Sequence, residues 1–153
     1  YKGRVREADF AAALPRCSMP VCYNGDLITE RDVSTVSERY PDLPAVMIGR
    51  ALIADPSLVA RLTGGKAADA KTLETFHDTL FMRYCEAFGD SRIAMLRMKE
   101  IWFYHLNLFE NSEKTGKAIK KAKNTAEFQS AAAAVFRNCR VRANAVPLWF
   151  KPA

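Results

Sequence analysis

The apolar positions of the first 65 residues fall into two short continuous runs separated by helical patterns. Residues 19–23 and 45–48 lack alternating polar positions, which is typical of strands that helices cover on both faces. The order of helices and strands therefore predicts β/α packing. Two strands cannot close a barrel, so we expect this part to need further strands. Helices are predicted over residues 4–14, over residues 30–39, and from Asp55-Pro56 onward.

The pattern becomes helical after Gly64-Gly65 and predicts no further strand. Residues 69–88 carry an apolar stripe at helical spacing, and residues 91–109 are apolar around much of the helix circumference. A helix of the second kind is typical of the centre of a bundle. With a last helix that begins near Thr125, we expect an antiparallel bundle of about four helices. The positions expected to point inward are Leu73, Phe76, Leu80, Tyr84 and Phe88 in the first helix, Ile93, Leu96, Ile101, Trp102, Tyr104 and Leu108 in the second, and Phe128, Ala132, Val135 and Phe136 in the last.

Capping residues mark several of the predicted helix ends. Thr29, three residues before Asp32, can accept a backbone hydrogen bond at the start of the helix over residues 30–39. Gly89 suits the left-handed position that ends a helix. The chain is therefore expected to be mostly helical, with a β/α part over residues 1–65 and a helical bundle over residues 66–153. The other predicted N-caps are Asp90 or Ser91, and Thr125.

The net charge of +6 belongs to the second part of the chain. Residues 1–65 contain eight Lys/Arg and eight Asp/Glu, whereas residues 66–153 contain fifteen and nine. This asymmetry indicates that the second part faces a polyanion, with a solvated basic surface as the alternative. No run of about 18 apolar residues occurs, so the sequence predicts no membrane span.

The cysteines and histidines do not form a recognisable catalytic or metal site. The four cysteines include no CxxC pair, and no histidine lies at a metal-ligand spacing from them, so we expect reduced cytoplasmic thiols and no metal. Cys17 precedes the first strand and Cys22 lies within it, which argues against a catalytic role for either. His77 and His105 lie in predicted helices without a nearby nucleophile or second ligand, and each is interpreted as a structural histidine.

Each apolar run ends in a glycine-containing turn, and the two turns lie one β/α unit apart. Asn24-Gly25-Asp26 follows the first run, and Gly49-Arg50 follows the second. The last two strand ends of a β/α barrel commonly form a phosphate site. Glycine lets the backbone approach the anion, while the Asn amide and the Arg guanidinium donate hydrogen bonds to it. Each turn alone is common, but the combination, with Asp55-Pro56 shortly after, predicts a phosphate site.

The run PVCYNGDLITERDV…AVMIGRALIADPSLV resembles the last two β/α units of tRNA-dihydrouridine synthases, whose pattern is P-V-x-x-N-G-D/E-I and then V-M-I-G-R-x-x-x-x-P. Tyr1-Lys2-Gly3 resembles the segment just after that family's H-x-R-T motif. Leu96-Arg97-Met98-Lys99 and Trp102-Phe103-Tyr104 resemble the R-K-H…W-Y pattern of the family's helical domain, with Met98-Lys99 in place of the usual Lys-His. The resemblance extends to about residue 138.

The resemblance implies the end of a TIM-type β/α barrel that binds flavin mononucleotide (FMN), followed by a helical RNA-binding domain. In that family the reduced flavin gives hydride to a uridine flipped out of tRNA, a cysteine protonates the base, and NAD(P)H reduces the flavin. The catalytic residues belong upstream, so none is expected in this chain, and the isolated chain should be inactive. The resemblance assigns Asn24, Gly25, Gly49 and Arg50 to the flavin phosphate, with Asp26 as a weaker candidate.

The lysine-rich stretch that precedes the last helix is the main candidate for RNA contact. Lys117, Lys120 and Lys121 share one helical face by their spacing. With the resemblance, we expect these charges and the neighbouring arginines to contact the tRNA backbone. The predicted RNA-binding residues are Lys114, Lys117, Lys120, Lys121, Lys123, Arg97, Arg137 and Arg140.

Two other interpretations stay open at this point. Another FMN-barrel oxidoreductase, such as a dihydroorotate dehydrogenase, would share the two phosphate turns but leaves the basic helical extension without an explanation. A stand-alone RNA-binding module, in which residues 1–65 only support the bundle, is the alternative of a different class. In the leading interpretation the partners are tRNA and the missing N-terminal part of the barrel. Without that part, domain swapping or self-association of the isolated chain is expected.

Overall fold

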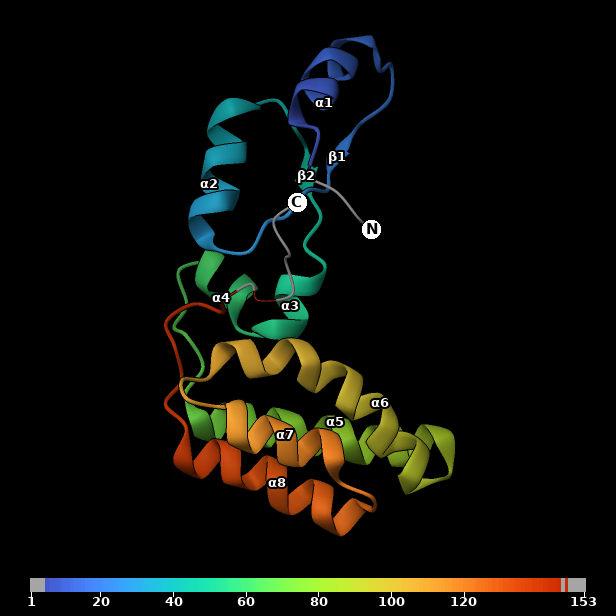
Figure 1. Cartoon of the computed structure of the whole chain (residues 1–153). Helices are drawn as coiled ribbons and strands as arrows, with labels where there is room; N and C mark the ends of the chain where they lie inside the picture. The colour runs from blue at the N-terminus through green and yellow to red at the C-terminus, as the bar shows by residue number, and fades with distance from the viewer. Residues whose placement is uncertain (1–4, 147, 149–153) are drawn as a thin grey trace.

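The computed structural model describes residues 5–146 and residue 148, so the segment Tyr1-Lys2-Gly3 lies outside the described residues. The chain is mostly helical (Figure 1), as the sequence predicts. A single two-stranded parallel sheet occurs among the described residues. It lies in the N-terminal part, and the C-terminal part forms a helical bundle below it in the view of Figure 1.

Residues 5–48 form a small unit around the parallel strands, called the strand unit below. The predicted apolar runs pair over only two residues each, with Cys22 opposite Ala45 and Tyr23 opposite Val46. A core of Tyr23, Leu27 and Val36 lies under the pair. The elements are α1 (Glu7–Ala13), a 3-10 turn η1 (Leu14–Arg16), β1 (Cys22–Tyr23), α2 (Glu30–Arg39) and β2 (Ala45–Val46).

Local capping explains why α2 begins where it does. The Thr29 hydroxyl oxygen accepts a hydrogen bond from the Asp32 backbone N–H at 3.3 Å, and the Thr29 N–H donates to the Asp32 carboxylate at 2.8 Å. This reciprocal capping box satisfies two backbone donors at the start of the helix. The predicted N-cap and the predicted range 30–39 are both confirmed.

The helix predicted from Asp55-Pro56 onward is wrong in detail. Two short helices, α3 (Arg50–Ala54) and α4 (Leu58–Leu62), lie on either side of that dipeptide. The Asp55 carboxylate accepts hydrogen bonds from the Ser57 N–H at 3.0 Å and from the Ser57 hydroxyl at 2.7 Å. A side chain that bonds to the backbone two residues later favours a turn over a helix.

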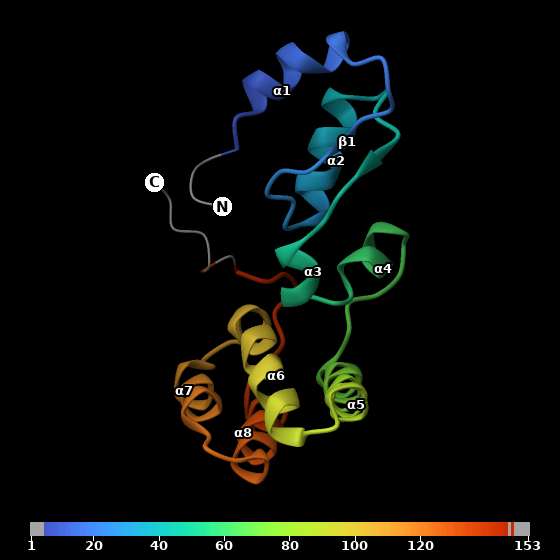
Figure 2. The same ribbon diagram turned by 90° about the vertical axis from the view of Figure 1, so that its right-hand side faces the viewer.

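The bundle contains four longer helices, and α6 lies between α3 and the other three (Figure 2). Asp69 and Asp90 cap α5 and α6, and Gly89 has the left-handed conformation expected of it, with φ of 63°. The last helix is capped by Asn124 rather than by Thr125, because the Asn124 side chain accepts from the Glu127 N–H at 2.9 Å. The elements are α5 (Ala70–Phe88), α6 (Ser91–His105), a 3-10 turn η2 (Leu106–Leu108), α7 (Glu113–Lys121) and α8 (Thr125–Asn138).

The buried faces of α5 and α6 differ from those predicted. In α5 the buried side chains are Leu73, His77 and Phe81, whereas Phe76 and Phe88 are exposed. The predicted stripe is correct at Leu73 but wrong at Phe76 and Phe88, because the buried face continues through His77 and Phe81. In α6 the exposed positions include Ile93 and Leu96, since both lie on the side away from the bundle core. The buried residues of α6 are Ala94, Met95, Met98, Trp102 and His105, and the inward positions predicted for α8 are confirmed.

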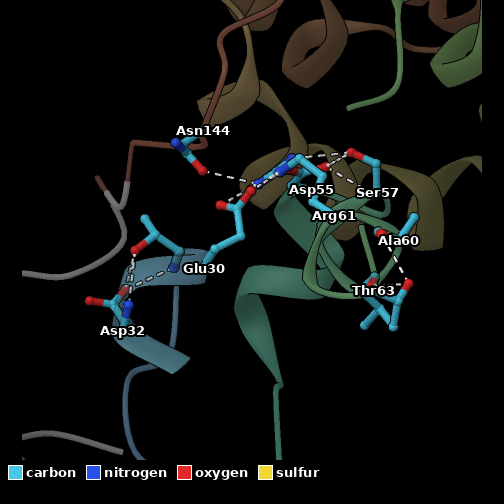
Figure 3. A network of polar contacts seen from close by, with 10 residues as sticks. Glu30, Asp32, Asp55, Ser57, Ala60, Arg61, Thr63 and Asn144 are labelled. Carbon is cyan, nitrogen blue, oxygen red and sulfur yellow. Dashed lines mark hydrogen bonds and ion pairs between the residues drawn. The ribbon is translucent and has the colours of Figure 1, made fainter. Parts of the chain in front are cut away.

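Helix α3 packs against α6, with Ala54 in the bundle core, and two polar contacts add to this attachment of the strand unit and its following helices. The His105 side chain on α6 donates from Nδ1 to the carbonyl oxygen of Ala54, the last residue of α3, at 3.1 Å. The Arg61 guanidinium on α4 bonds to Glu30 of α2, to Asp55, and to Asn144 beyond the bundle (Figure 3). Chain segments far apart in the sequence therefore meet at one buried arginine.

Two phenylalanines of the bundle should differ strongly in their contribution to stability. Phe128 is fully buried, whereas Phe103 is 61% exposed. We expect Phe128→Ala to lower the free energy of unfolding by about 3–5 kcal/mol, because it leaves a cavity. Phe103→Ala should lower it by about 1 kcal/mol or less. Urea denaturation of the two variants measures the difference, and equal losses would contradict this packing.

Candidate functional site

The parallel register places the two strand-end turns side by side. The Met47 N–H donates to the Tyr23 carbonyl oxygen at 2.8 Å, so both strands end at the same edge of the sheet. Arg50 Nη2 then donates to Asp26 Oδ1 at 2.9 Å, which joins the second turn to the first. Residues that lie one β/α unit apart in the sequence are thus adjacent in space, as the turn motifs predict.

The two glycines of these turns serve different purposes. A Cβ atom at Gly25 would lie 2.7 Å from Tyr23 Oη, so glycine is required there by the close approach of that ring. A Cβ atom at Gly49 would meet nothing within 4 Å. The backbone at Gly49 is therefore open to a ligand, whereas the backbone at Gly25 is packed against the strand unit.

The turn residues fit a phosphate group only in part. The Asn24 side chain is exposed, and an amide can donate to a phosphate oxygen. Arg50 carries the positive charge, but the Asp26 carboxylate already faces its guanidinium. A carboxylate repels a phosphate, so Asp26 is suited to orienting Arg50 rather than to binding the anion itself.

A strongly basic surface lies on α7, α8 and the residues that follow α8. Residues 113–142 contain eight Lys/Arg and two Asp/Glu, an excess of six that equals the net charge of the whole chain. Ile119 is the buried residue of α7, and Lys114, Lys117 and Lys121 lie on the opposite, exposed face at i, i+3 and i+7. These three side chains are called the lysine row below.

Other basic side chains lie at both ends of the lysine row. The Thr115 hydroxyl is 3.7 Å from Cys139 Sγ, so the end of α8 is beside the start of α7. The exposed Arg137 and Arg140 lie two residues before and one residue after Cys139 in the sequence. Lys120 and Lys123 are exposed at the opposite end of α7. Seven of the predicted RNA-binding residues are therefore gathered on one helical hairpin.

The basic residues of this hairpin lack the ion pairs that several basic residues form elsewhere. Lys71, Arg83 and Arg97 each pair with a glutamate three residues later in the sequence. Within residues 5–146, by contrast, no carboxylate lies within 4 Å of the seven hairpin residues. Arg97 differs from the seven, because it lies on α6 and donates to Glu100 at 3.2 Å. The unpaired residues are Lys114, Lys117, Lys120, Lys121, Lys123, Arg137 and Arg140.

Lys99, at the position where the resembled family has a histidine, has a structural contact. Its Nζ donates to the Ala122 carbonyl oxygen at 2.5 Å and to the Lys120 carbonyl oxygen at 3.4 Å. A cation at the C-terminal end of a helix satisfies free carbonyl groups and interacts favourably with the helix dipole. Lys99 therefore stabilises the end of α7, and the neighbouring lysines remain directed to solvent.

His77 and His105 are buried beside Trp102, with ring centroids 5.4 Å and 5.2 Å from the indole. The Nδ1 atom of His77 lies 3.0 Å from an Asp78 carboxylate oxygen, and that of His105 lies 3.1 Å from a carbonyl oxygen. Burial disfavours the charged ring, which lowers the pKa of His77 and lowers the pKa of His105 to about 4. Both are structural histidines.

The described residues show no metal cluster and no membrane-crossing helix. Within them no group of three or more His, Cys, Asp and Glu side chains could hold a metal ion. No helix in the same part of the chain is long and apolar enough to cross a membrane. Cys17 and Cys22 are free and exposed.

His105 should make the stability of the bundle depend on pH. Its pKa in the folded chain is about 4, and its ordinary value of 6.5 applies after unfolding. As the pH is lowered, the unfolded chain therefore binds a proton at a higher pH than the folded chain does. The free energy of unfolding should fall as the pH drops from about 6.5 to about 4, by about 3 kcal/mol from this group.

His105→Gln removes this titration but keeps an amide donor for the Ala54 carbonyl. Urea denaturation of both proteins at about pH 7 and about pH 4.5 should show a smaller loss of stability for the variant. An equal loss in the two proteins would mean that His105 is not held neutral.

A scan against models of protein families finds none that matches this chain, and a search of curated proteins finds no similar sequence. The functional conclusion therefore depends on two features of the molecule. One is the pair of strand-end turns joined by Arg50 and Asp26. The other is the surface of unpaired basic side chains on α7 and α8. Both are suited to anions, and the second is the larger.

Proposed function

We propose that this chain is the C-terminal part of a flavin-dependent tRNA-dihydrouridine synthase, a cytoplasmic tRNA-modifying oxidoreductase. In this proposal the strand unit with α3 and α4 is the end of an FMN-binding β/α barrel, and α5–α8 bind the tRNA backbone. The flavin supplies the hydride chemistry, while this chain holds the phosphate end of the flavin and the RNA. The observation that carries the proposal is the set of unpaired basic side chains on the α7–α8 hairpin.

The arrangement of the hairpin supports contact with RNA phosphates rather than with bases. Lysine is a flexible point charge, and the row offers no pocket in which a base could be inserted. Because the row has no carboxylate partners within residues 5–146, its positive charge is not neutralised locally. Phosphates along one strand of RNA are a partner of matching charge and shape.

The strand unit supports the flavin part of the proposal through the placement of its turns. Two parallel strands end at one edge, and Asn24, Gly49 and Arg50 lie there together. This is the edge at which β/α proteins bind phosphates. We propose that Asn24 and Arg50 donate to the phosphate, that Gly49 allows the backbone to approach it, and that Asp26 orients Arg50.

A stand-alone RNA-binding module is the second candidate. The observation that favours it is the Arg50–Asp26 ion pair, which reduces the positive charge available to a phosphate at the turns. In that alternative the strand unit only supports the bundle, and the basic hairpin keeps the same role. The two candidates differ in whether the parent protein binds flavin.

Reversing the charge of the three lysines in the lysine row should weaken RNA binding and reduce the dependence of the affinity on salt. Each lysine that neutralises a phosphate releases a counterion, and it adds about one to the salt slope. The variant Lys114→Glu, Lys117→Glu, Lys121→Glu should bind tRNA at least roughly tenfold more weakly at low salt, with a slope smaller by about 3. Filter binding of a mixed tRNA pool over a salt series measures both.

A matched control reverses three exposed basic residues outside the hairpin, namely Arg16, Arg31 and Lys66. This control changes the net charge by the same amount, so it separates the surface from the total charge. Similar losses of affinity in both variants would indicate attraction by net charge alone. Unchanged affinity in the lysine-row variant would assign the RNA surface elsewhere.

The isolated chain should be colourless and should not reduce uridine in tRNA. The turns contact only the phosphate end of the flavin, and a phosphate alone contributes little affinity to a ligand of that size. Visible absorbance of the purified chain, and assay of dihydrouridine after incubation with NAD(P)H and tRNA, test this expectation. Stoichiometric flavin in the purified chain would mean that the described turns belong to a complete site.

A further inference from the structure

The Arg61 guanidinium uses all of its hydrogen-bond donors on other parts of the chain (Figure 3). Nε donates to Glu30 Oε1 at 2.6 Å, and Nη2 donates to Glu30 Oε2 at 3.3 Å. Nη2 also donates to Asn144 Oδ1 at 3.0 Å. Nη1 donates to the Asp55 carboxylate and to Ser57 Oγ. A guanidinium offers five N–H groups in a fixed planar fork, so this arrangement defines the position of each partner.

The two carboxylates that Arg61 holds come directly after the two strand-end turns. The first turn ends at Asp26, and Glu30 begins α2 only four residues later. The second turn ends at Arg50, and Asp55 follows the single short helix α3. Buried Leu27 and the Thr29 capping box make the first connection rigid. Arg61 therefore holds the chain where it leaves each turn.

Asn144, the third partner, is attached to the bundle. The Arg142 N–H donates to the Leu108 carbonyl oxygen at 2.8 Å, and the Val146 N–H donates to the Asn107 carbonyl oxygen at 2.9 Å. Ala145, between them, is buried in the bundle core. The segment that carries Asn144 is thus fixed to η2 and continues from the basic end of α8.

The burial of Asp55 and the near burial of Arg61 at the centre of this network favour a role in orientation over a role in stability. The Arg61 side chain is 9% exposed and the Asp55 side chain is 2% exposed. Removing such charges from water costs free energy, and apolar residues of similar size often stabilise a fold as well or better. A guanidinium whose N–H groups are all bonded instead fixes one arrangement of its partners, because each N–H group donates along only one direction.

We propose that Arg61 is a positioning residue that sets the orientation of the two strand-end turns relative to the RNA-binding bundle. The functional meaning of this inference rests on the proposed function, because it needs both an anion at the turns and RNA on α7–α8. The positioning role itself does not depend on the proposed function, because Arg61 joins α2, the 55–57 turn and the Asn144 segment whatever each of them binds. RNA held on the bundle would thereby lie at a fixed angle to the anion site.

The orientation can be measured by residual dipolar couplings of the amides in the whole chain. We expect that α2 no longer has one fixed orientation relative to α6 in Arg61→Met. The amide signals of Asn24, Gly25, Gly49 and Arg50 should shift in the same variant. Arg61→Lys keeps the charge but not the fork, so it should restore the orientation only in part. The amide signals of α7 and α8 should stay unchanged in both variants.

Arg39→Met is the matched control, because Arg39 forms an ion pair with Glu7 inside the strand unit and does not reach the bundle. It should leave the α2–α6 angle unchanged. Asn144→Ala, which removes only the bond to the bundle segment, should change that angle while the two turns keep their mutual arrangement. If Arg61→Met unfolds the strand unit, Asn144→Ala still tests whether the Arg61 network sets the α2–α6 angle.

An unchanged α2–α6 angle in Arg61→Met, or in Asn144→Ala when Arg61→Met does not fold, would overturn the inference. The tRNA affinity of Arg61→Met is a separate readout, and we expect it to equal that of the parent chain. If the chain binds no tRNA while the angle still depends on Arg61, the proposed function fails and the positioning role stands. If tRNA binds and the angle does not depend on Arg61, only the positioning role fails.

Discussion

The guanidinium of Arg61 is the group on which, in our proposal, the orientation of the strand unit depends. The strand unit has a small core of its own, with three buried residues and two strands of two residues each. Such a unit has little apolar surface with which to attach itself to the bundle. Bonds from Arg61 to Glu30, Asp55 and Asn144 add to the packing of α3 on α6, and each replaces a bond to water that the guanidinium has lost.

The centre of the bundle differs from the charged network around Arg61, because its polar groups include aromatic rings that stay neutral. His77, Trp102 and His105 lie in contact beneath aromatic side chains. The Ala54 carbonyl accepts from Nδ1 of His105, so Nε2 of that ring carries no proton. This bond joins α3 to α6 without placing a charge in the core.

Surface charge is distributed unevenly between the two parts. In the strand unit and on α5 and α6, several arginines and lysines have carboxylate partners, as in Arg39–Glu7 and Arg83–Glu86. The seven basic residues of the α7–α8 hairpin have none within residues 5–146, and residues 113–142 carry an excess of six positive charges. Exposed ion pairs contribute little to stability, so the missing pairs cost the fold little. Their absence leaves a surface whose positive potential is available to an anionic partner.

The sequence alone determined what depends on neighbours along the chain: the Thr29 cap, the Gly89 stop, the mostly helical character, the turn after each strand and the charge of residues 113–142. Tertiary structure decided the rest. Burial of His77 selected Leu73 and Phe81 rather than Phe76 as the inner face of α5, because packing, and not residue polarity, sets which side is covered. Arg61 could not be singled out, since its partners Glu30 and Asn144 lie 31 and 83 residues away. A hydrogen bond over such a separation exists only after the chain has folded, whereas the residues of a cap or of a charge cluster are already neighbours along the unfolded chain.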